Sequence, residues 1–253
     1  MKKLSIIFTV LLLAFNVKAQ VSFGLQIGAN SSNISYIVGD DFDGSDFDYP
    51  VKSKFGLNIG LVVDYAINDQ AGLQTGLMYS QKGYQVDWDA FLKENDLSGD
   101  VEIEGYWKRN YNYLELPLHF YYNANGVKIF AGPYFAYGLS GSSDIDLTLK
   151  GNGDTVTMKE EFTLNPVSGD VKAEDFLHDG EDWYDIKVFN ALDFGFDVGL
   201  GYQYEQFFAK LQYSIGMSNL TPGISDVDDF DRNDLKKTNK GISFSVTYFF
   251  TPK

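Results

Sequence analysis

The stretch DFGFDVGLGY, residues 193–202, alternates strictly between large apolar residues and residues that are acidic or glycine. Successive side chains of a β-strand point to opposite faces, so this stretch predicts a strand with two very different faces. The apolar face carries Phe194, Phe196, Val198, Leu200 and Tyr202. The apolar face needs an apolar environment, whereas the face with acids and glycines needs a polar and tightly packed one.

Seven further segments repeat this period of two. They are residues 21–29, 55–67, 72–80, 113–122, 127–138, 207–218 and 241–250. Each of the eight segments has about the 9 to 11 residues that a tilted strand needs to cross a bilayer. An even number of strands also allows the sheet to close with both ends of the chain on one side. Pro117 and Pro133 predict a bulge or a local break in their strands, because a closed barrel has no free edge.

A soluble β-sandwich or lipocalin-like barrel is the other architecture that alternates in this way. In a soluble barrel the charges would face outward and the apolar side chains would fill the narrow interior. Here every charge within a strand shares its face with the glycines, as expected for a polar interior and a lipid-facing apolar coat. The connections also alternate between short turns (68–71, 123–126, 203–206) and long loops (30–53, 82–110, 140–188, 219–239). We therefore predict an all-β fold, an eight-stranded antiparallel transmembrane β-barrel with long extracellular loops.

The N-terminal residues have the pattern of a secretory signal peptide. Basic residues at the start precede an apolar run from Leu4 to Phe15, and Val17-Lys18-Ala19 fits a cleavage site. The apolar run is too short to span a bilayer as a helix. We expect residues 1–19 to be removed and residues 20–253 to form the barrel domain, exported to the bacterial outer membrane.

Charge and cysteine content exclude several classes of function. The net charge is −15, which argues against nucleic acid as a partner. Most of the acidic residues lie in the long connections, so the negative charge is expected on the extracellular side. The chain has no cysteine, which excludes a disulfide scaffold, a thiol nucleophile and a cysteine-ligated zinc site.

Several segments resemble a known family. These are FGLQIGANSSNIS from Phe23, YNYLELPLHFYY from Tyr111, AGPYFAYGLSG from Ala131, DFGFDVGLGYQY from Asp193 and LQYSIGMSNLT from Leu211. Together with the aromatic last strand they resemble the small outer-membrane β-barrel proteins of Bacteroidota, the PorT-like or porin-type barrels. The resemblance covers the strands and none of the long loops. It implies an outer-membrane barrel, and a few such barrels are parts of secretion systems.

Seven ionisable side chains are expected to face the lumen: Asp64, Glu115, His119, Lys128, Asp193, Asp197 and Lys210. The simpler interpretation is a network of ion pairs and hydrogen bonds that fills a barrel too narrow to conduct. The alternative is a small gated conduit in which Lys128 or Lys210 switches between carboxylates. Because the acids outnumber the lysines, such a conduit would prefer cations.

A lipid-modifying enzyme would need a serine and a histidine side by side on the lipid-facing surface. His119 is expected in the lumen and His178 lies in an acidic loop, so we predict no catalytic residues. The acidic stretches 39–50 and 225–237 suggest calcium loops, but Asp234 and Lys240 occupy positions where the EF-hand pattern requires Gly and Glu. We expect no metal site and no cofactor; weak bridging of lipopolysaccharide phosphates by divalent cations is the alternative for these stretches.

The long connections 82–110 and 140–188 contain alternating patches of their own, and we expect them to extend the barrel as paired strands. One hairpin is predicted to turn at residues 151–154. The aromatic residues Trp88, Trp107, Phe176, Trp183 and Tyr184 are candidates for a contact surface, with packing inside the loop cap as the alternative. The function expected is therefore that of a non-enzymatic structural or partner-binding barrel. Its partners would be outer-membrane lipid, lipopolysaccharide and other outer-membrane or periplasmic proteins; a minor cation-preferring pore is the second choice.

Overall fold

The computed structural model describes residues 21–38, 50–94, 101–151, 153–172, 175, 187–225 and 235–250. The elements in chain order are β1 (Val21–Val38), β2 (Val51–Ala66), β3 (Ala71–Val86), α2 (Trp88–Glu94), β4 (Val101–Ala124), β5 (Val127–Gly151), β6 (Asp154–Val167), β7 (Val188–Asn190), β8 (Leu192–Tyr204), β9 (Phe207–Gly216) and β10 (Leu235–Phe249). None of the helices in these described ranges has the length and apolar character needed to cross a membrane.

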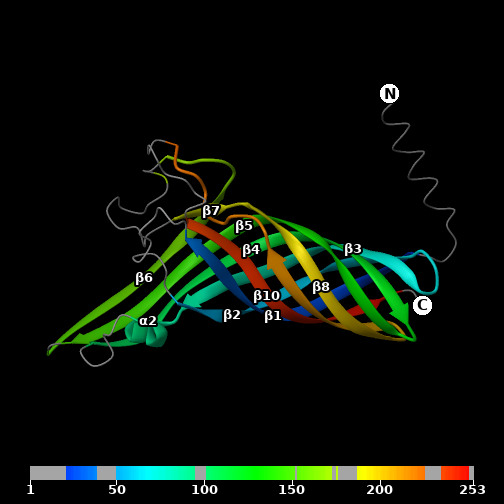
Figure 1. Ribbon diagram of the computed structural model, residues 1–253, viewed down its shortest axis with the longest axis horizontal. Coiled ribbons are helices and arrows are strands. Elements are labelled where there is room, and N and C mark those ends of the chain that lie inside the picture. Colours follow the sequence, from blue (N-terminus) through cyan, green and yellow to red (C-terminus); the bar gives the residue numbers. More distant parts are fainter. Residues whose placement is uncertain are drawn as a thin grey trace.

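Eight of the strands form a closed ring (Figure 1). The order around it is β4-β3-β2-β1-β10-β9-β8-β5, and pairing of β4 with β5 closes it. All the pairs within the ring are antiparallel. The predicted all-β fold and eight-stranded antiparallel barrel are thus confirmed. We call the end with the short turns after β2, β4 and β8 the periplasmic end, and the opposite end the extracellular end.

The apolar side chains of the barrel lie on its outer surface. Phe55 is 66% exposed and Ile27 is 62% exposed, whereas Asp64 and Asp197 on the opposite faces of their strands are both 0% exposed. This distribution is the inverse of that in a soluble protein, and it satisfies both faces when the outer one contacts lipid tails. The apolar coat ends below Lys240 on β10, and the strands continue beyond it at the extracellular end.

Glycines on the lumen face make room for aromatic rings from neighbouring strands. A Cβ on Gly199 would collide with the ring of Phe130, and one on Gly201 would collide with the ring of Phe208. The same relation holds between Gly72 and the Tyr121 side chain. The glycines therefore let large rings fill an interior that is only eight strands wide.

Beyond the membrane the wall of the barrel continues into an extracellular arm, which we define as residues 101–112 of β4, 140–151 of β5, β6 and α2 (Figure 1). The predicted hairpin is confirmed, because Gly151 pairs with Asp154 where β5 turns into β6. β4 and β5 each continue from the barrel into the arm, and β6 pairs with the arm portion of β5. The strands predicted from the sequence were too short, because backbone pairing continues beyond the point where the apolar coat ends.

The prolines interrupt pairing without shifting it. Thr75 and Met78 pair with Leu118 and Glu115 in one register, while the positions between them, opposite Pro117, are unpaired. The Thr75 hydroxyl donates a hydrogen bond of 2.7 Å to the Pro117 carbonyl. The local break predicted at Pro117 is therefore present, and no bulge accompanies it.

Candidate functional site

The lumen near the periplasmic end holds a buried ion pair. The Lys128 ammonium lies 3.0 Å from a carboxylate oxygen of Asp64. The Tyr121 hydroxyl donates a hydrogen bond to the other carboxylate oxygen at 2.9 Å. The Gln74 amide donates to the same oxygen that Lys128 contacts, at 3.4 Å. Lys128 also lies 4.2 Å from the centre of the Tyr121 ring. Four strands, β2 to β5, thus meet on one buried carboxylate.

A second buried pair joins β4 to β8. His119 Nε2 lies 2.8 Å from Asp197 Oδ2, and both side chains are buried. The ring of Phe130 stacks on the imidazole with centroids 5.0 Å apart. A neutral imidazole can donate from Nε2 to the carboxylate, so this contact does not require a protonated histidine.

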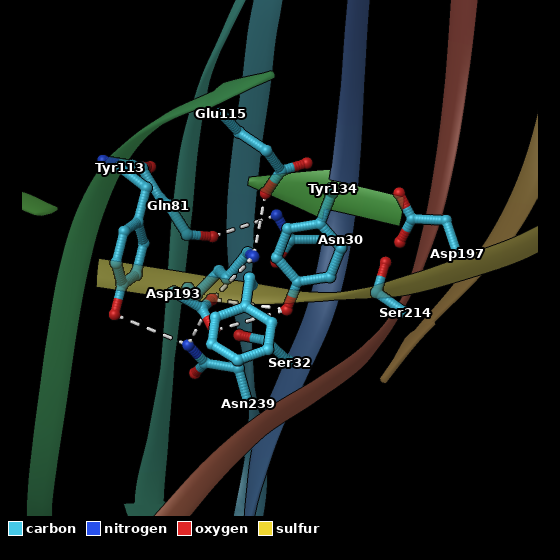
Figure 2. Close-up of polar contacts among 12 residues, drawn as sticks. Asn30, Ser32, Gln81, Tyr113, Glu115, Tyr134, Asp193, Asp197, Ser214 and Asn239 are labelled. Carbon is cyan, nitrogen blue, oxygen red and sulfur yellow. Dashed lines mark hydrogen bonds and ion pairs between the residues drawn. The ribbon is translucent and has the colours of Figure 1, made fainter. Parts of the chain in front are cut away.

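The third group lies nearer the extracellular end and is centred on Asp193 (Figure 2). Its carboxylate accepts hydrogen bonds from Ser218 Oγ at 2.7 Å and from Asn239 Nδ2 at 2.9 Å, and the Lys82 ammonium lies 3.3 Å away. Lys82 also pairs with Glu115 at 2.8 Å and lies 4.2 Å from the centre of the Tyr134 ring. One lysine therefore bridges two carboxylates and connects β3, β4 and β8.

Lys210 is the lumen lysine without such a partner. Among the described residues no carboxylate lies within ion-pairing distance of its ammonium, although its side chain is buried and lies 5.4 Å from the Phe130 ring centre. It lines a cavity of about 50 Å³ inside the barrel, together with Asn30, Asn58 and Gln212. The amide oxygens of Asn30 and Asn58 are buried and accept no hydrogen bond from the described residues. This chamber is large enough for water, which would satisfy these groups.

Two clusters of buried apolar side chains lie in the lumen, one on each side of the chamber. The lower cluster, toward the periplasm, consists of Val62, Met78, Phe208 and Phe249. The upper cluster consists of Ile34, Tyr84, Tyr111, Tyr113, Tyr134, Ala136, Leu164, Phe189 and Leu220. The chamber reaches from Met78 of the lower cluster to Tyr134 of the upper cluster. The described residues thus leave the chamber between two apolar layers.

Phe189 completes the upper cluster from outside the ring. Its ring lies 4.9 Å from that of Tyr111 and 6.1 Å from that of Tyr113. Hydrogen bonds hold the segments beside it: Asn190 N donates to the Leu220 carbonyl, and Leu220 N donates to the Lys237 carbonyl. Residues 188–191 before β8 and residues 219–220 therefore lie against the mouth of the barrel.

Two basic side chains lie among the aromatic residues at the extracellular mouth of the barrel, beyond the apolar coat. Arg109 is buried, and Lys237 lies 5.3 Å from the centre of the Tyr36 ring. Burial together with repulsion from Arg109 lowers the pKa of Lys237 to about 7. Burial also raises the pKa of Tyr111 and of Tyr36, so both hydroxyls are neutral hydrogen-bonding groups.

The proposed aromatic contact surface is corrected in part. Trp107 is only 9% exposed, stacks on Trp88 with ring centroids 6.3 Å apart and donates from Nε1 to Ser143 Oγ at 3.0 Å. Trp107 thus packs inside the arm, as in the alternative to a contact surface, because α2 places Trp88 against it. Phe176, Trp183, Tyr184 and His178 lie outside the described residues.

All seven ionisable residues predicted to face the lumen are buried there. The prediction did not include Lys82 and Arg109, because both lie beyond the ends of the strands predicted over residues 72–80 and 113–122. A signal was available, since Met78, Ser80 and Lys82 continue the lumen-facing alternation past the predicted end of their strand. Within the described part of the chain, no group of three metal-ligating side chains comes close enough to hold an ion.

Ion pairs cover the outer face of the arm. Lys150 lies 2.8 Å from Glu104, and Lys159 lies 3.0 Å from Asp146. The opposite face is apolar, with Trp107, Ile145 and Leu147 at its centre and Met158 against them. The arm therefore has a small core of its own.

Comparison with known proteins identifies a family. A family model described as outer membrane protein beta-barrel domain matches residues 15–222. No curated protein sequence matches the chain. Among solved structures, Ail, the attachment invasion locus protein of Yersinia pestis, is similar at 11% identity over 91% of this chain and 99% of Ail, with a TM-score of 0.36.

Two further solved structures show the same range of likeness. Neisserial surface protein A is 12% identical over 90% of this chain and 97% of its own, with a TM-score of 0.38. LpxR from Salmonella typhimurium is 12% identical over 90% of this chain and 100% of its own, with a TM-score of 0.27. The family match spans most of the chain and agrees with the hydrogen-bonded ring. The chain is therefore a member of the outer membrane protein beta-barrel domain family, and its place is the outer membrane.

Proposed function

We propose that this protein is a non-enzymatic outer-membrane barrel with a plugged lumen, and that it acts as a structural or partner-binding element through its extracellular arm and acidic loops. The observation that carries the proposal is the pair of apolar clusters above and below the lumen chamber. When the interior is filled in this way, the outer surfaces of the protein remain available for contact with other molecules. The three-stranded arm, which projects beyond the extracellular end of the barrel, is one of these surfaces.

The finer parts of the proposal come from the sequence. The resemblance to PorT-like barrels of Bacteroidota supports a role as a subunit of a secretion, assembly or uptake complex. Residues 1–19 would serve as a signal peptide, and lipopolysaccharide would be the neighbour of the arm. The burial of His119 in the lumen supports a non-enzymatic role, because a lipid substrate in the membrane cannot reach it.

Planar-bilayer recording of the refolded full chain tests the plugged lumen. We expect no steady conductance steps, since ions would have to cross both apolar clusters. Reproducible cation-selective steps would overturn the plugged-barrel proposal and favour the second candidate, a minor cation-preferring pore. The observation that favours that candidate is the polar chamber around Lys210.

Partner binding is tested by gentle detergent extraction and identification of the proteins that co-purify. The matched variant replaces residues 147–158 by Asn-Gly, because Asp146 pairs with Lys159 and a two-residue turn fits between them. We expect a partner with the full chain and its loss with the shortened arm, while the barrel still folds. Folding is checked by the shift in gel mobility on boiling. An identical set of co-purifying proteins with both chains would contradict a role for the arm.

A further inference from the structure

We propose that the outer edge of β6 pairs antiparallel with the same edge of a second copy of this chain in a facing membrane. The proposal deepens the partner-binding role and rests on it. β6 pairs with β5 along residues 154–164 on one side, and only Asn165–Val167 pair with β7 on the other. No strand in the described part of the chain pairs with the outer edge of residues 154–164. Such an edge offers unpaired backbone groups to another strand.

The sequence of this edge is complementary to itself. In an antiparallel pair with its two-fold axis at Glu160, Lys159 of each copy lies opposite Glu161 of the other. Val156 then lies opposite Leu164, Met158 opposite Phe162, and Thr157 opposite Thr163. Each of these pairs joins residues of one face, so apolar side chains meet apolar ones and opposite charges meet.

The charges select this register among its neighbours. A shift by two residues in one direction places Lys159 opposite Lys159, and a shift in the other direction places Glu161 opposite Glu161. Like charges directly opposite each other destabilise a strand pair. A shift by one residue would place apolar side chains against the charged face. Glu160 opposite Glu160 weakens the selected register, which keeps a single contact reversible.

The orientation of the arm determines where the second copy must be. The arm projects beyond the extracellular end of the barrel, away from the end where the short turns lie (Figure 1). In every copy β6 runs from the tip of the arm at Asp154 back toward the barrel. Two copies in one membrane therefore point these strands the same way, and antiparallel pairing requires copies in facing membranes. Many weak contacts between two membranes add up to a strong attachment.

The test is the clustering of proteoliposomes that carry the full chain, measured by light scattering. We expect wild-type vesicles to cluster. Glu161→Lys vesicles should not, because two lysines then face each other in each opposed pair; the variant should still fold, since the new lysine lies across from Asp144 on β5. Lys159→Glu vesicles should not cluster either, because two glutamates then face each other.

Mixing provides the decisive result. Vesicles with Glu161→Lys and vesicles with Lys159→Glu should cluster with each other, because every opposed pair is then again of opposite charge. The double variant Lys159→Glu/Glu161→Lys should cluster by itself. Control variants Lys236→Glu on β10 and Glu205→Lys in the turn after β8 carry the same changes in charge outside the arm, and should each behave like wild type.

Failure of wild-type vesicles to cluster would overturn the proposal. So would clustering that the β6 variants and the control variants alter equally, because general charge effects would then explain it. Loss of clustering in both single variants without recovery in the mixture would also contradict the register. A partner protein that still co-purifies through the arm would leave the proposed function standing, so the two failures can be distinguished.

Discussion

Replacing Asp64 with asparagine removes one charge from the lumen and leaves the shape of the side chain almost unchanged. In the wild type Asp64 is fully buried and pairs with Lys128, which is itself only 3% exposed. After the substitution the Lys128 ammonium still lies over the Tyr121 and Phe208 rings, whose centres are 4.2 Å and 5.0 Å away in the wild type. Aromatic faces compensate only part of the desolvation of a buried ammonium.

Breaking a buried pair by removing one partner costs roughly 3–5 kcal/mol, because an uncompensated charge remains. We expect Asp64→Asn to lower the free energy of unfolding by about this much. Lys128→Met should cost less, because Tyr121 and Gln74 still donate to the carboxylate. In the double variant Asp64→Asn/Lys128→Met no charge remains to be desolvated, so its stability should return close to that of the wild type.

Urea unfolding in lipid vesicles, followed by gel mobility, measures these differences. The exposed pair of Lys52 and Asp87 is the control, and Lys52→Met should cost less than about 1 kcal/mol, since surface ion pairs contribute little. If the double variant loses as much stability as the sum of the single variants, the two side chains do not act as a pair and the reasoning is refuted. A coupling of about 3 kcal/mol supports it.

Three further predictions concern the mouth and the packing of the lumen. With the pKa of Lys237 at about 7 in the folded protein and about 10.4 when unfolded, stability should rise between these pH values, and Lys237→Met should abolish this rise in pH-dependent unfolding. Gly199→Ala should displace Phe130 and lower the unfolding free energy by about 1–3 kcal/mol, with an unchanged unfolding midpoint contradicting the packing described. Phe189→Ala should destabilise the upper cluster by roughly 3–5 kcal/mol, as measured by hydrogen exchange. Bilayer recordings of this variant should still show no conductance steps, because the lower cluster remains.

Much of the barrel could be predicted because the alternation within each single strand shows which residues share a face. In residues 193–202 the acids and glycines share one face, and the structure places that face in the lumen. The short turns and the hairpin at Gly151–Asp154 also followed from local sequence. These features depend on neighbours in the chain, so periodicity alone reports them.

The ends of the strands and the partners of each side chain could not be predicted in the same way. Lys82 lies past the predicted end of its strand, and its bridge between Glu115 and Asp193 was not foreseen. For Trp107 the sequence left a contact surface and packing in the loop cap open, and the structure has it covered by Trp88 from α2. In both cases the contact joins residues from different strands or from a helix, and local alternation reports the face of a side chain but not its partner.

By itself the sequence determined that eight strands have an apolar and a polar face, because each strand must satisfy two environments at once. It also placed seven ionisable side chains in the interior, but not Lys82 or Arg109. Only the tertiary structure decided that Lys82 bridges two carboxylates while Lys210 faces a chamber, and that β6 keeps an outer edge along residues 154–164. The physical reason is that ring closure sets which strands lie opposite each other, and pairing across the lumen depends on distances that the order of residues along one strand does not contain.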